Sequence, residues 1–375
     1  MSAVEALKRM AAVVIFAATF VICAVLMSAA AVPQTAAPLP ALDFEKMMQP
    51  IPASAAFHDP GYFVWCGTMV AGGDGKYHLY YSRWKIADGF QSWVTRSEVA
   101  HAVGDSPTGP FVFHDVALPA RGKQFWDGLV THNPTIRKFG SKYYLYYTGN
   151  TGDGVVSASL NWTHRNNQRI GVAVAESPNG PWKRMDKPVI DVSADPTAPD
   201  SLCMANPGIT KGRDGRYYLL YKAVGRKNPL PFGGPVVHMM AESDSPEGPF
   251  HKDMKVLFTV AGNAFPFEDP FFWYDARRDT YFVIMKDNHG VIAGTGHSTL
   301  ILYQSKDASD WAKAEHLLVS DLELHWKDRP LEKVLAMERP QLSFDPQGNP
   351  IALIVAIRAN DPESYNVRIP LLATQ

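Results

Sequence analysis

Short runs of apolar and aromatic residues recur along the chain, and each follows a turn. Five of these runs, at residues 75–81, 141–147, 215–221, 279–284 and 349–355, are only six or seven residues long and rich in Tyr, Leu, Val and Ile. Runs of this length and composition are typical of buried β-strands, because a helix needs a longer segment with a 3.6-residue period. The pattern therefore predicts a protein built mainly from short strands.

A second pattern places these strands in a repeat. Residues 105–111, 176–182 and 244–250 share the form acid-Ser-Pro-x-Gly-Pro-aromatic, and a degenerate copy occupies residues 305–311. The Ser-Pro steps begin at positions 106, 177 and 245, so they are 71 and then 68 residues apart. Because Pro and Gly favour turns, the chain is expected to consist of similar units of about 70 residues.

Five units with four short strands each predict an all-β fold, a five-bladed β-propeller with four antiparallel strands per blade. A blade cannot bury its faces alone, so stacking the blades in a ring supplies the core. Closure of the ring by an N-terminal strand is left open by the sequence. The expected blades are residues 58–118, 119–190, 191–257, 258–320 and 321–373.

The N-terminal segment differs from the rest of the chain. Two basic residues precede an apolar run, residues 10–32, that ends in small residues. This predicts a secretory signal peptide over residues 1–31, with an uncleaved N-terminal membrane anchor as the alternative. The Pro- and Ala-rich residues 32–50 are expected to be a linker, and residues 51–375 the propeller catalytic domain. We therefore expect an exported protein, periplasmic or extracellular.

The net charge and the cysteine spacing limit which kinds of partner and cofactor are expected. The 36 basic and 37 acidic residues give a net charge of −1, which does not indicate nucleic acid as a partner, and a membrane is expected only through an uncleaved anchor. Beyond the N-terminal segment only Cys66 and Cys203 remain, without zinc-ligand spacing, so both are interpreted as small buried residues, with one disulfide between them as the alternative. We expect no metal-binding residues and no cofactor, apart from a structural or channel cation such as calcium.

Candidate chemistry lies where the blades meet the axis. The innermost strand of each blade starts at one end of the central channel, and the antiparallel second strand returns to that end. Pro270 is expected to keep Asp269 in an extended backbone conformation. The strand entrances hold Trp65-Cys66, His132-Asn133, Asn206, Glu268-Asp269 and Glu338-Arg339, and the returning strands end in Arg83-Trp84, Lys222 and Lys286-Asp287.

The adjacent carboxylates Glu268 and Asp269 are the most distinctive of these residues. No local turn requires both, and like charges side by side raise the pKa of one member. Cleavage of a glycosidic bond uses such carboxyl groups, one as acid and one as base or nucleophile. The residues predicted to bind the sugar are Trp65, Arg83, Trp84, Trp126, His132, Asn133, Asn206, Lys222, Lys286, Asp287, Glu338 and Arg339.

Several motifs resemble one group of proteins. Residues 65–68 (Trp-Cys-Gly-Thr), 126–128 (Trp-Asp-Gly), 132–134 (His-Asn-Pro) and 268–270 (Glu-Asp-Pro) resemble the five-bladed propeller glycoside hydrolases of families 32, 43, 62, 68 and 117, most closely a family-43-like branch often labelled "sucrase". The likeness covers nearly all of residues 57–370. In these families a first-blade Asp is the base or nucleophile, a second-blade Asp tunes the pKa, and a later Glu is the acid.

The resemblance implies that Glu268 is the general acid, with its neighbouring carboxylate setting its pKa. This sequence departs from the family pattern at two entrances, where Cys66 and Asn133 stand in place of Asp. The resemblance therefore leaves Asp59 or Asp127 as the predicted base.

The predicted function is hydrolysis of a glycosidic bond in a plant or algal saccharide of the furanoside or anhydro-sugar type, with Glu338 and Arg339 orienting the sugar. The candidate carboxylates lie on different blades, and room for a water between them favours inversion of the anomeric carbon. Two alternatives stay open. One is a carbohydrate-binding propeller without catalysis, and the other is a glycosyl transferase or phosphorylase served by Lys222 and Lys286.

Overall fold

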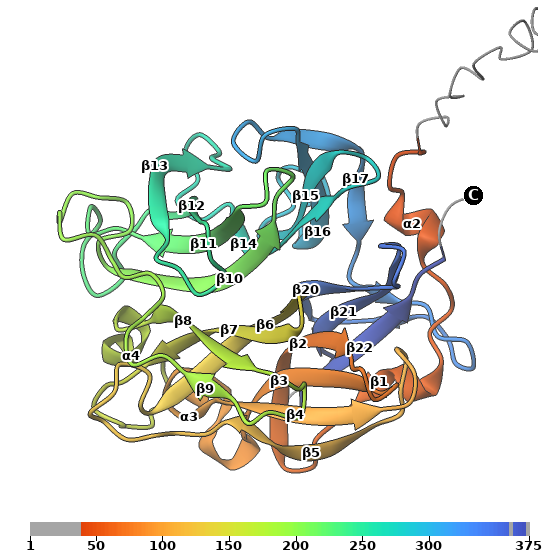
Figure 1. The fold of residues 1–375 in the computed structure, drawn as a ribbon, viewed down its shortest axis with the longest axis horizontal. Helices are drawn as coiled ribbons and strands as arrows, with labels where there is room; N and C mark the ends of the chain where they lie inside the picture. Colours follow the sequence, from red (N-terminus) through yellow and green to blue (C-terminus); the bar gives the residue numbers. More distant parts are fainter. Residues whose placement is uncertain (1–38, 360–362, 373–375) are drawn as a thin grey trace, which may run out of the picture. The chain divides into compact units, whose positions relative to one another are not determined.

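Five four-stranded antiparallel sheets surround a common axis in the computed structural model, which describes residues 39–359 and 363–372 (Figure 1). In four of the sheets the strands pair in chain order, from an innermost strand at the axis to an outermost strand at the edge. The predicted five-bladed β-propeller with four antiparallel strands per blade is confirmed.

The blades are numbered in chain order, and their strands are given from the axis outward. Blade 1 comprises β2 (Tyr62–Ala71), β3 (Tyr77–Lys85), β4 (Glu98–Gly104) and β5 (Phe111–Leu118); blade 2 comprises β6 (Val130–Phe139), β7 (Lys142–Asn150), β8 (Arg169–Ala175) and β9 (Lys183–Arg184); blade 3 comprises β10 (Cys203–Lys211), β11 (Tyr217–Val224), β12 (Val236–Ser243) and β13 (His251–Leu257); blade 4 comprises β14 (Phe267–Asp275), β15 (Thr280–Asp287), β16 (Thr299–Ser305) and β17 (Ala312–Ser320); blade 5 comprises β20 (Ala336–Phe344), β21 (Pro350–Arg358), β22 (Tyr365–Pro370) and β1 (Ala56–Phe57).

The two ends of the described chain close the ring. Strand β1 pairs antiparallel with β22, with Ala56 opposite Val367 and Phe57 opposite Asn366. Blade 5 therefore takes its outermost strand from the N-terminal side of blade 1. This pairing settles the closure that the sequence left open, and it fixes blade 5 beside blade 1.

The hydrophobic core lies between blades rather than within any one of them. Tyr146 and Val172 of blade 2 pack in one cluster with Leu219 and Met239 of blade 3, and all four side chains are fully buried. Burial of each such side chain contributes about 1.5–3 kcal/mol. Because two blades supply the larger clusters, a single blade is not expected to fold alone.

Part of the predicted linker is folded. Helix α2 (Phe44–Met47) begins after Asp43, whose side chain accepts a hydrogen bond from the Lys46 N–H. Phe44, Met47 and Ile51 are buried in a cluster with blades 4 and 5. This segment folds because its apolar residues pack against blades 4 and 5. Its Pro- and Ala-rich composition did not reveal that neighbouring surface.

The predicted signal peptide or anchor, residues 1–31, lies outside the described residues, as do residues 32–38 of the predicted linker. Within the part of the chain that the structure describes, no helix has the length and apolar character needed to span a membrane.

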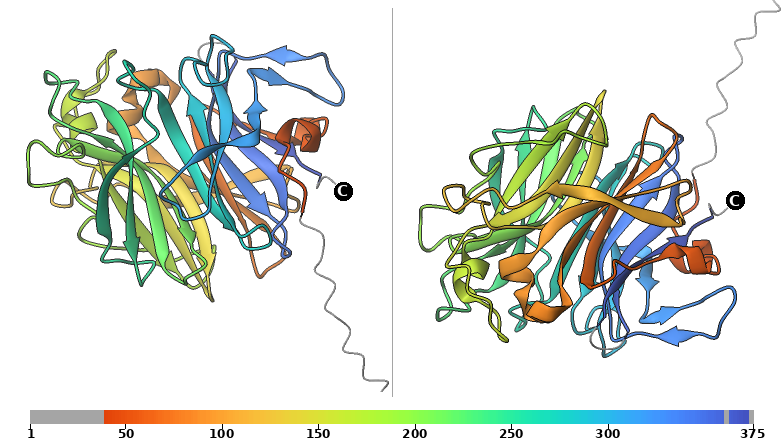
Figure 2. Two further views of the ribbon diagram at one scale, coloured as in Figure 1. Left: turned by 90° about the horizontal axis from the view of Figure 1, so that it is seen from above. Right: turned by 90° about the horizontal axis from the view of Figure 1, so that it is seen from below.

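The connections between strands carry single helical turns and one extra hairpin, which stands beside α2 (Figure 2). Three of these turns follow one another in the connection between β3 and β4. The elements are η1 (Ala53–Ala55), η2 (Ile86–Asp88), η3 (Phe90–Ser92), α3 (Trp93–Arg96), α4 (Trp162–Asn166) and the hairpin β18 (Glu323–Leu324) and β19 (Glu332–Lys333).

Candidate active site

Every blade has the same backbone irregularity near the start of its innermost strand. The register against the second strand shifts there. Such β-bulges re-aim side chains, and five of them bring five side chains toward the axis. The bulged residues have left-handed φ angles: Cys66 (54°), Asn133 (50°), Asn206 (56°), Asp269 (61°) and Arg339 (54°).

The extended conformation predicted for Asp269 is wrong. The proline that follows it favours an extended backbone, yet φ is 61°. A non-glycine residue in this region costs of order 1–3 kcal/mol. Hydrogen bonds from Asn206 and Arg339 to the Asp269 carboxylate offset that cost, so the tertiary contacts override the local preference.

The five bulged residues form one hydrogen-bonded chain across the axis. Cys66 Sγ donates to Asn133 Oδ1 (2.6 Å), and Asn133 Nδ2 donates to Asn206 Oδ1. Asn206 Nδ2 then donates to Asp269 Oδ1 (2.8 Å). From the other side, the Arg339 backbone N–H donates to Asp269 Oδ2 (3.1 Å), and its Nη1 lies 3.3 Å from Oδ1. Asp269 is therefore the final acceptor of the chain.

Both described cysteines, Cys66 and Cys203, are buried free thiols. Burial raises the pKa of the Cys66 thiol. A thiol that keeps its proton is a hydrogen-bond donor rather than a nucleophile. Cys66 therefore orients the amide chain and does not supply a reactive thiolate.

Two glutamates and two lysines lie beside this chain. Lys222 Nζ donates to Glu268 Oε1 (2.5 Å). Lys286 Nζ donates to Glu338 Oε1 (2.5 Å) and lies 4.0 Å from Glu268 Oε2. The β14–β15 register explains one contact, because Glu268 faces Lys286 across the two strands. Together with the carboxylate–guanidinium pair of the hydrogen-bonded chain, three carboxylates face three cations.

The pKa values of the two glutamates shift in opposite directions from the ordinary value. Burial raises the pKa of Glu268, but the charges of Lys222 and Lys286 outweigh burial and lower it to about 2. Burial raises the pKa of Glu338, and Lys286 offsets only part of that effect. One carboxylate is thereby kept ionised and the other is suited to carry a proton, which is the division found in acid–base pairs.

Aromatic side chains enclose this charged layer in a pocket of about 170 Å³. Trp93 stacks on His132 with ring centroids 4.9 Å apart, and Trp65 meets Phe90 edge to face at 5.6 Å. This volume is well below the roughly 300–1,000 Å³ of a drug-sized site, so the pocket fits one small ring. Its lining is Trp65, Trp84, Phe90, Trp93, His132, Asn133, Asn206, Lys222, Glu268, Asp269 and Glu338.

His132 is oriented from both sides of its ring. Nδ1 is 2.7 Å from Ser97 Oγ, and Nε2 is 4.0 Å from Cys66 Sγ. Burial lowers the pKa of His132, and the positive charges of Arg339 and Lys222 lower it further. A neutral imidazole therefore faces the pocket, able to exchange hydrogen bonds but not to add a positive charge.

A second pocket of about 370 Å³ adjoins the first and shares Trp93, Lys222 and Glu268 with it. Its outer wall includes Trp162 and Phe232, whose ring centroids are 4.6 Å apart. The Phe232 side chain is 63% exposed. An elongated molecule that enters the first pocket can therefore extend over an exposed aromatic surface.

Most predicted site residues meet at this place. Nine of them line the axial pocket, and Lys286 and Arg339 contact residues of its lining. The nine are Trp65, Trp84, His132, Asn133, Asn206, Lys222, Glu268, Asp269 and Glu338.

The other five predicted residues lie outside the pocket: Asp59, Arg83, Trp126, Asp127 and Asp287. Asp59 Oδ2 accepts hydrogen bonds from Tyr81 (2.6 Å) and Arg83 (2.8 Å). Asp287 Oδ2 accepts from two backbone N–H groups of the following loop, at 2.7 and 3.0 Å. Asp59 and Arg83 therefore hold a strand end in place, and Asp287 holds the loop that follows it in the chain.

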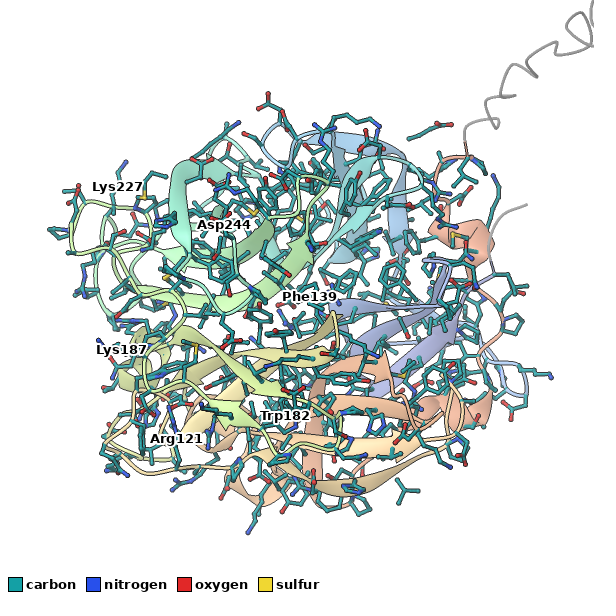
Figure 3. All side chains as sticks on the ribbon, viewed as in Figure 1. Arg121, Phe139, Trp182, Lys187, Lys227 and Asp244 are labelled. Carbon is teal, nitrogen blue, oxygen red and sulfur yellow. The ribbon has the colours of Figure 1, made fainter. Side chains whose placement is uncertain are left out.

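Trp126 and Asp127 belong to the outer part of blade 2. Asp127 accepts hydrogen bonds from Arg121 Nε (2.7 Å) and Tyr147 OH (2.6 Å), and Arg184 Nη1 lies 3.4 Å away. Trp126 stacks on Tyr147 with centroids 5.8 Å apart. Arg121 lies toward the periphery of the ring (Figure 3). This cluster ties the β5–β6 connection to the edge of blade 2.

Sequence reasoning missed Phe90 and Trp93, which line the axial pocket. Both belong to the helical turns between β3 and β4. Two aromatic residues in a connection that follows a returning strand end, here Trp84, were the available signal. A connection is harder to place than a repeat because its backbone does not recur from blade to blade.

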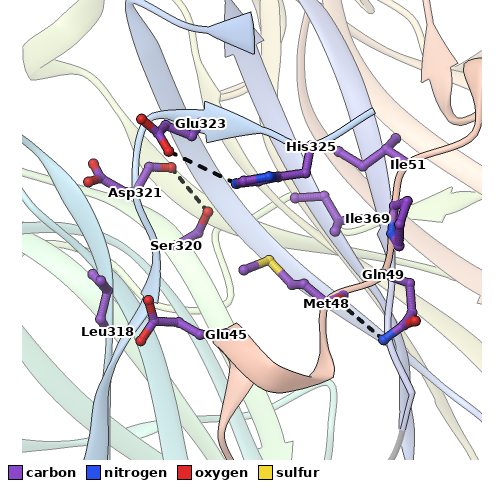
Figure 4. A pocket seen from close by; sticks show the side chains of 11 residues that line it. Glu45, Met48, Gln49, Ile51, Leu318, Ser320, Asp321, Glu323, His325 and Ile369 are labelled. Atoms are coloured by element: carbon purple, nitrogen blue, oxygen red, sulfur yellow. Dashed lines mark hydrogen bonds and ion pairs between the residues drawn. The ribbon is translucent and has the colours of Figure 1, made fainter. Parts of the chain in front are cut away.

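A larger pocket, about 440 Å³, lies elsewhere, between α2 and the segment around β18 (Figure 4). Its acidic residues are engaged at the surface. Asp321 is 2.6 Å from His297 Nε2, and Glu323 is 3.2 Å from Lys333. Size therefore does not identify the reactive site, and the buried carboxylates of opposite pKa shift occur at the axis.

No protein-family model and no curated protein matches the sequence. Solved structures do match. A family 117 glycoside hydrolase from Zobellia galactanivorans is 17% identical, with a TM-score of 0.58 and 90% of each chain covered. An endo-arabinase from Bacteroides thetaiotaomicron is 13% identical over 87% of this chain and 98% of that one, with a TM-score of 0.55.

An arabinanase from Bacillus subtilis is 14% identical over 85% of this chain and 96% of that one, with a TM-score of 0.54. Identities this low, with nearly complete coverage, report on architecture. The chain therefore has the five-bladed propeller fold of glycoside hydrolases, as found in a family 117 enzyme and in arabinanases.

Proposed function

We propose that this protein is a glycoside hydrolase that cleaves a glycosidic bond of a plant or algal saccharide, of the furanoside or anhydro-sugar type. The observation that carries the proposal is the pair Glu268 and Glu338. The two carboxylates share one aromatic pocket, one with a pKa of about 2 and the other with a raised pKa. The arabinanases and the family 117 hydrolase of the same fold support this sugar class.

In this proposal Glu338 is the proton donor to the leaving oxygen, and Glu268 is the ionised carboxylate. The family resemblance implied that Glu268 is the acid. Lys222 at 2.5 Å and Lys286 at 4.0 Å favour its ionised form, so the roles are exchanged. Asp269, the final acceptor of the hydrogen-bonded chain, positions the backbone that carries Glu268.

The separation of the two glutamates favours retention of the anomeric configuration. Both contact Lys286 Nζ, at 4.0 and 2.5 Å, so Glu268 Oε2 and Glu338 Oε1 are no further apart than the sum, 6.5 Å. Carboxyl groups lie about 5–5.5 Å apart in retaining enzymes and about 6.5–9.5 Å apart in inverting ones. This limit favours a nucleophilic Glu268 over the inversion expected from the sequence.

The proposed reaction has two steps. Glu338 protonates the glycosidic oxygen while Glu268 attacks the anomeric carbon and the bond to the leaving group breaks. Glu338 then takes a proton from water, which displaces Glu268 from the sugar. The axial pocket holds the ring under attack, and the adjoining pocket at Trp162 and Phe232 receives the rest of the saccharide.

The test is a screen of the untagged protein against arabinan oligosaccharides, other furanosides and anhydrogalactose-containing oligosaccharides. Reducing ends measure hydrolysis, and proton NMR of the first product gives its anomeric configuration. Hydrolysis with retention that is lost in Glu268→Gln supports the proposal. Asp59→Asn is the matched control, since Asp59 is a buried carboxylate outside the pocket. If only Asp59→Asn lost activity, the role of the ionised carboxylate would be assigned to Asp59 instead of Glu268.

A second candidate function is carbohydrate binding without catalysis. Cys66 and Asn133 favour it, because the related families have Asp at these entrances. Under this reading the wild-type protein binds a sugar of the panel, forms no product, and keeps its affinity in Glu338→Gln. Calorimetric titration with the same panel distinguishes the two functions.

A further inference from the structure

A row of acidic and histidine side chains crosses the outer half of blade 1. Both Asp74 carboxylate oxygens lie 3.2 Å from His78 Nε2, and His78 Nδ1 is 2.9 Å from His101 Nε2. His101 Nδ1 is 3.3 Å from Asp115 Oδ1, and His114 Nδ1 is 3.2 Å from Asp115 Oδ2. His78 and His101 are buried, while Asp115 and His114 are about half exposed. None of the five residues lines the axial pocket.

A bulge in the outermost strand, β5, brings two neighbouring residues to the same side. His101 pairs with Asp115 and Ala102 pairs with Phe113, so His114 is the extra residue. Successive side chains of a regular strand point to opposite faces, but at this bulge the rings of His114 and His101 are 5.0 Å apart. One ligand atom each from His101, His114 and Asp115 lies within 4.8 Å of the others.

The count of hydrogens along the row leaves one contact unfilled. Asp74, His78, His101 and Asp115 make three successive contacts, and two neutral imidazoles supply only two N–H groups. If His78 donates to Asp74, its Nδ1 must accept from His101 Nε2. His101 Nδ1 then presents a lone pair to the Asp115 carboxylate. With the hydrogens in this order, two acceptors face each other at 3.3 Å, and a cation between them would remove their repulsion.

We propose that His101 Nδ1, His114 and Asp115 bind a divalent transition-metal ion, for which Zn²⁺ is the best match to two imidazoles and a carboxylate. Two ligand atoms at tetrahedral positions, each about 2.0–2.1 Å from zinc, are about 3.3 Å apart. His101 Nδ1 is 3.3 Å from Asp115 Oδ1, and His114 Nδ1 is 3.2 Å from Asp115 Oδ2, so each imidazole lies at about this distance from one oxygen of the carboxylate. A water molecule would complete the four ligands.

Asp74 and His78 act as positioning residues behind the ion. They fix the tautomer of His101, as hydrogen-bonded carboxylates do for zinc-binding histidines. Gly72 makes room for them, since a Cβ at this position would lie 2.3 Å from Asp74 Oδ1 and 2.7 Å from His78 Nε2. No sequence pattern indicated this site, because its residues come from three strands and a turn with no recurrent spacing.

The ion would stabilise the contact between blades 1 and 2. Tyr80 stacks on His101 with ring centroids 4.8 Å apart, and its hydroxyl donates to the Pro178 carbonyl of blade 2. Asn179 of the same turn lies 3.5 Å from Asp74. A metal that holds His101 therefore supports the blade interface, and we expect Zn²⁺ to raise the melting temperature.

The test measures Zn²⁺ binding to the untagged full chain by competition with a chromophoric chelator, and Co²⁺ absorption reports the coordination number. One equivalent of Zn²⁺ and a four-coordinate Co²⁺ spectrum are expected. His114→Ala and Asp115→Asn should each weaken binding at least about 10-fold. The matched control is His251→Ala, an exposed histidine on the outermost strand of blade 3, which should leave the affinity unchanged.

Asp74→Asn separates a positioning role from general surface binding. The Asn amide can donate to His78 Nε2, which would reverse the hydrogens along the row and put a proton on His101 Nδ1. We expect a 10–100-fold loss of Zn²⁺ affinity, although residue 74 does not touch the ion. No stoichiometric binding, unchanged binding in His114→Ala, or a six-coordinate Co²⁺ spectrum would overturn the proposal. In nitrogen NMR, a His101 imidazolium signal that stays unchanged when Zn²⁺ is added would show that a proton occupies the contact between His101 and Asp115. That result would also overturn the proposal.

Discussion

Two carboxylate clusters, one at the axis and one at the edge of blade 2, make similar contacts with cations but differ in side-chain exposure. At the edge, Asp127 accepts hydrogen bonds from Arg121 and Tyr147, and its side chain is completely buried. At the axis, Glu268 and Glu338 also contact cations, yet their side chains remain 19% and 24% exposed. Burial and charge pairing therefore do not by themselves distinguish the two clusters, whereas contact with the axial pocket does.

The balance of charges differs as well. Asp127 is one carboxylate facing two guanidinium groups, so nothing competes for its negative charge. At the axis Lys286 is shared between Glu268 and Glu338. A cation shared by two carboxylates lets one of them hold a proton while the other stays ionised. The edge cluster is fixed, and the axial cluster can exchange a proton.

The largest expected effect is on the reaction rate in Glu338→Gln. Loss of the proton donor should lower kcat/KM on the substrate found in the screen by about 10²–10⁴-fold. A nitrophenyl glycoside, whose leaving group needs no protonation, should recover much of that loss. Thermal unfolding is the control and should change little, because Glu268 still faces Lys286. An unchanged kcat/KM would remove Glu338 from the mechanism.

The next effect is on stability, in Asp127→Asn. Removing one partner of a buried ion pair costs about 3–5 kcal/mol, and Arg121 and Arg184 would both lose the charge of this buried carboxylate. Urea unfolding measures this, and activity per folded molecule should stay constant. Asp186→Asn is the matched control, since Asp186 pairs with Arg121 at 3.3 Å but is 82% exposed, and it should cost less than about 1 kcal/mol. If Asp127→Asn remained stable but lost activity, the edge cluster would also contribute to function, and the comparison would fail.

A smaller effect is expected from pH. The pKa of Glu268 falls from 4.5 to about 2 in the folded state, so its contribution to stability is complete above pH 4.5 and is lost as pH falls toward 2. Glu268→Gln should remove that loss in urea unfolding at acid pH. The pKa of Glu338 is raised by burial, so kcat/KM should fall as pH rises through this pKa. A rate that increases over the same pH range would contradict the assignment of Glu338 as acid.

The smallest effect is expected at the exposed aromatic wall. Stacking of a saccharide on Phe232 is worth about 0.5–1.5 kcal/mol, so Phe232→Ala should raise KM for long substrates by roughly 2- to 10-fold. Short glycosides that fill only the axial pocket should be unaffected. Val112→Ala, another exposed apolar residue at 70% exposure, is the control. Equal effects on short and long substrates would show that the adjoining pocket does not bind the saccharide.

The repeat made the fold and half of the site predictable. Turns about 70 residues apart defined equivalent positions, and the structure gives all five the same bulge. Phe90 and Trp93 were missed because their connection occurs in one blade alone. Asp59 and Asp127 were candidates because Cys66 and Asn133 stand at two entrances where the family pattern has Asp. Only the packing showed that buried arginines and tyrosines already occupy both carboxylates.

The sequence by itself determined the five-bladed ring and placed Glu268, Asp269 and Glu338 at its axis. Those facts depend on local turns and strand periods, which a linear pattern records. The tertiary structure alone decided which carboxylate has the lowered pKa and which has the raised one. Lys222 and Lys286 reach Glu268 from blades 3 and 4, and partial burial in the axial pocket raises the pKa of Glu338. A pKa is set by distance and desolvation, and neither is a property of neighbours along the chain.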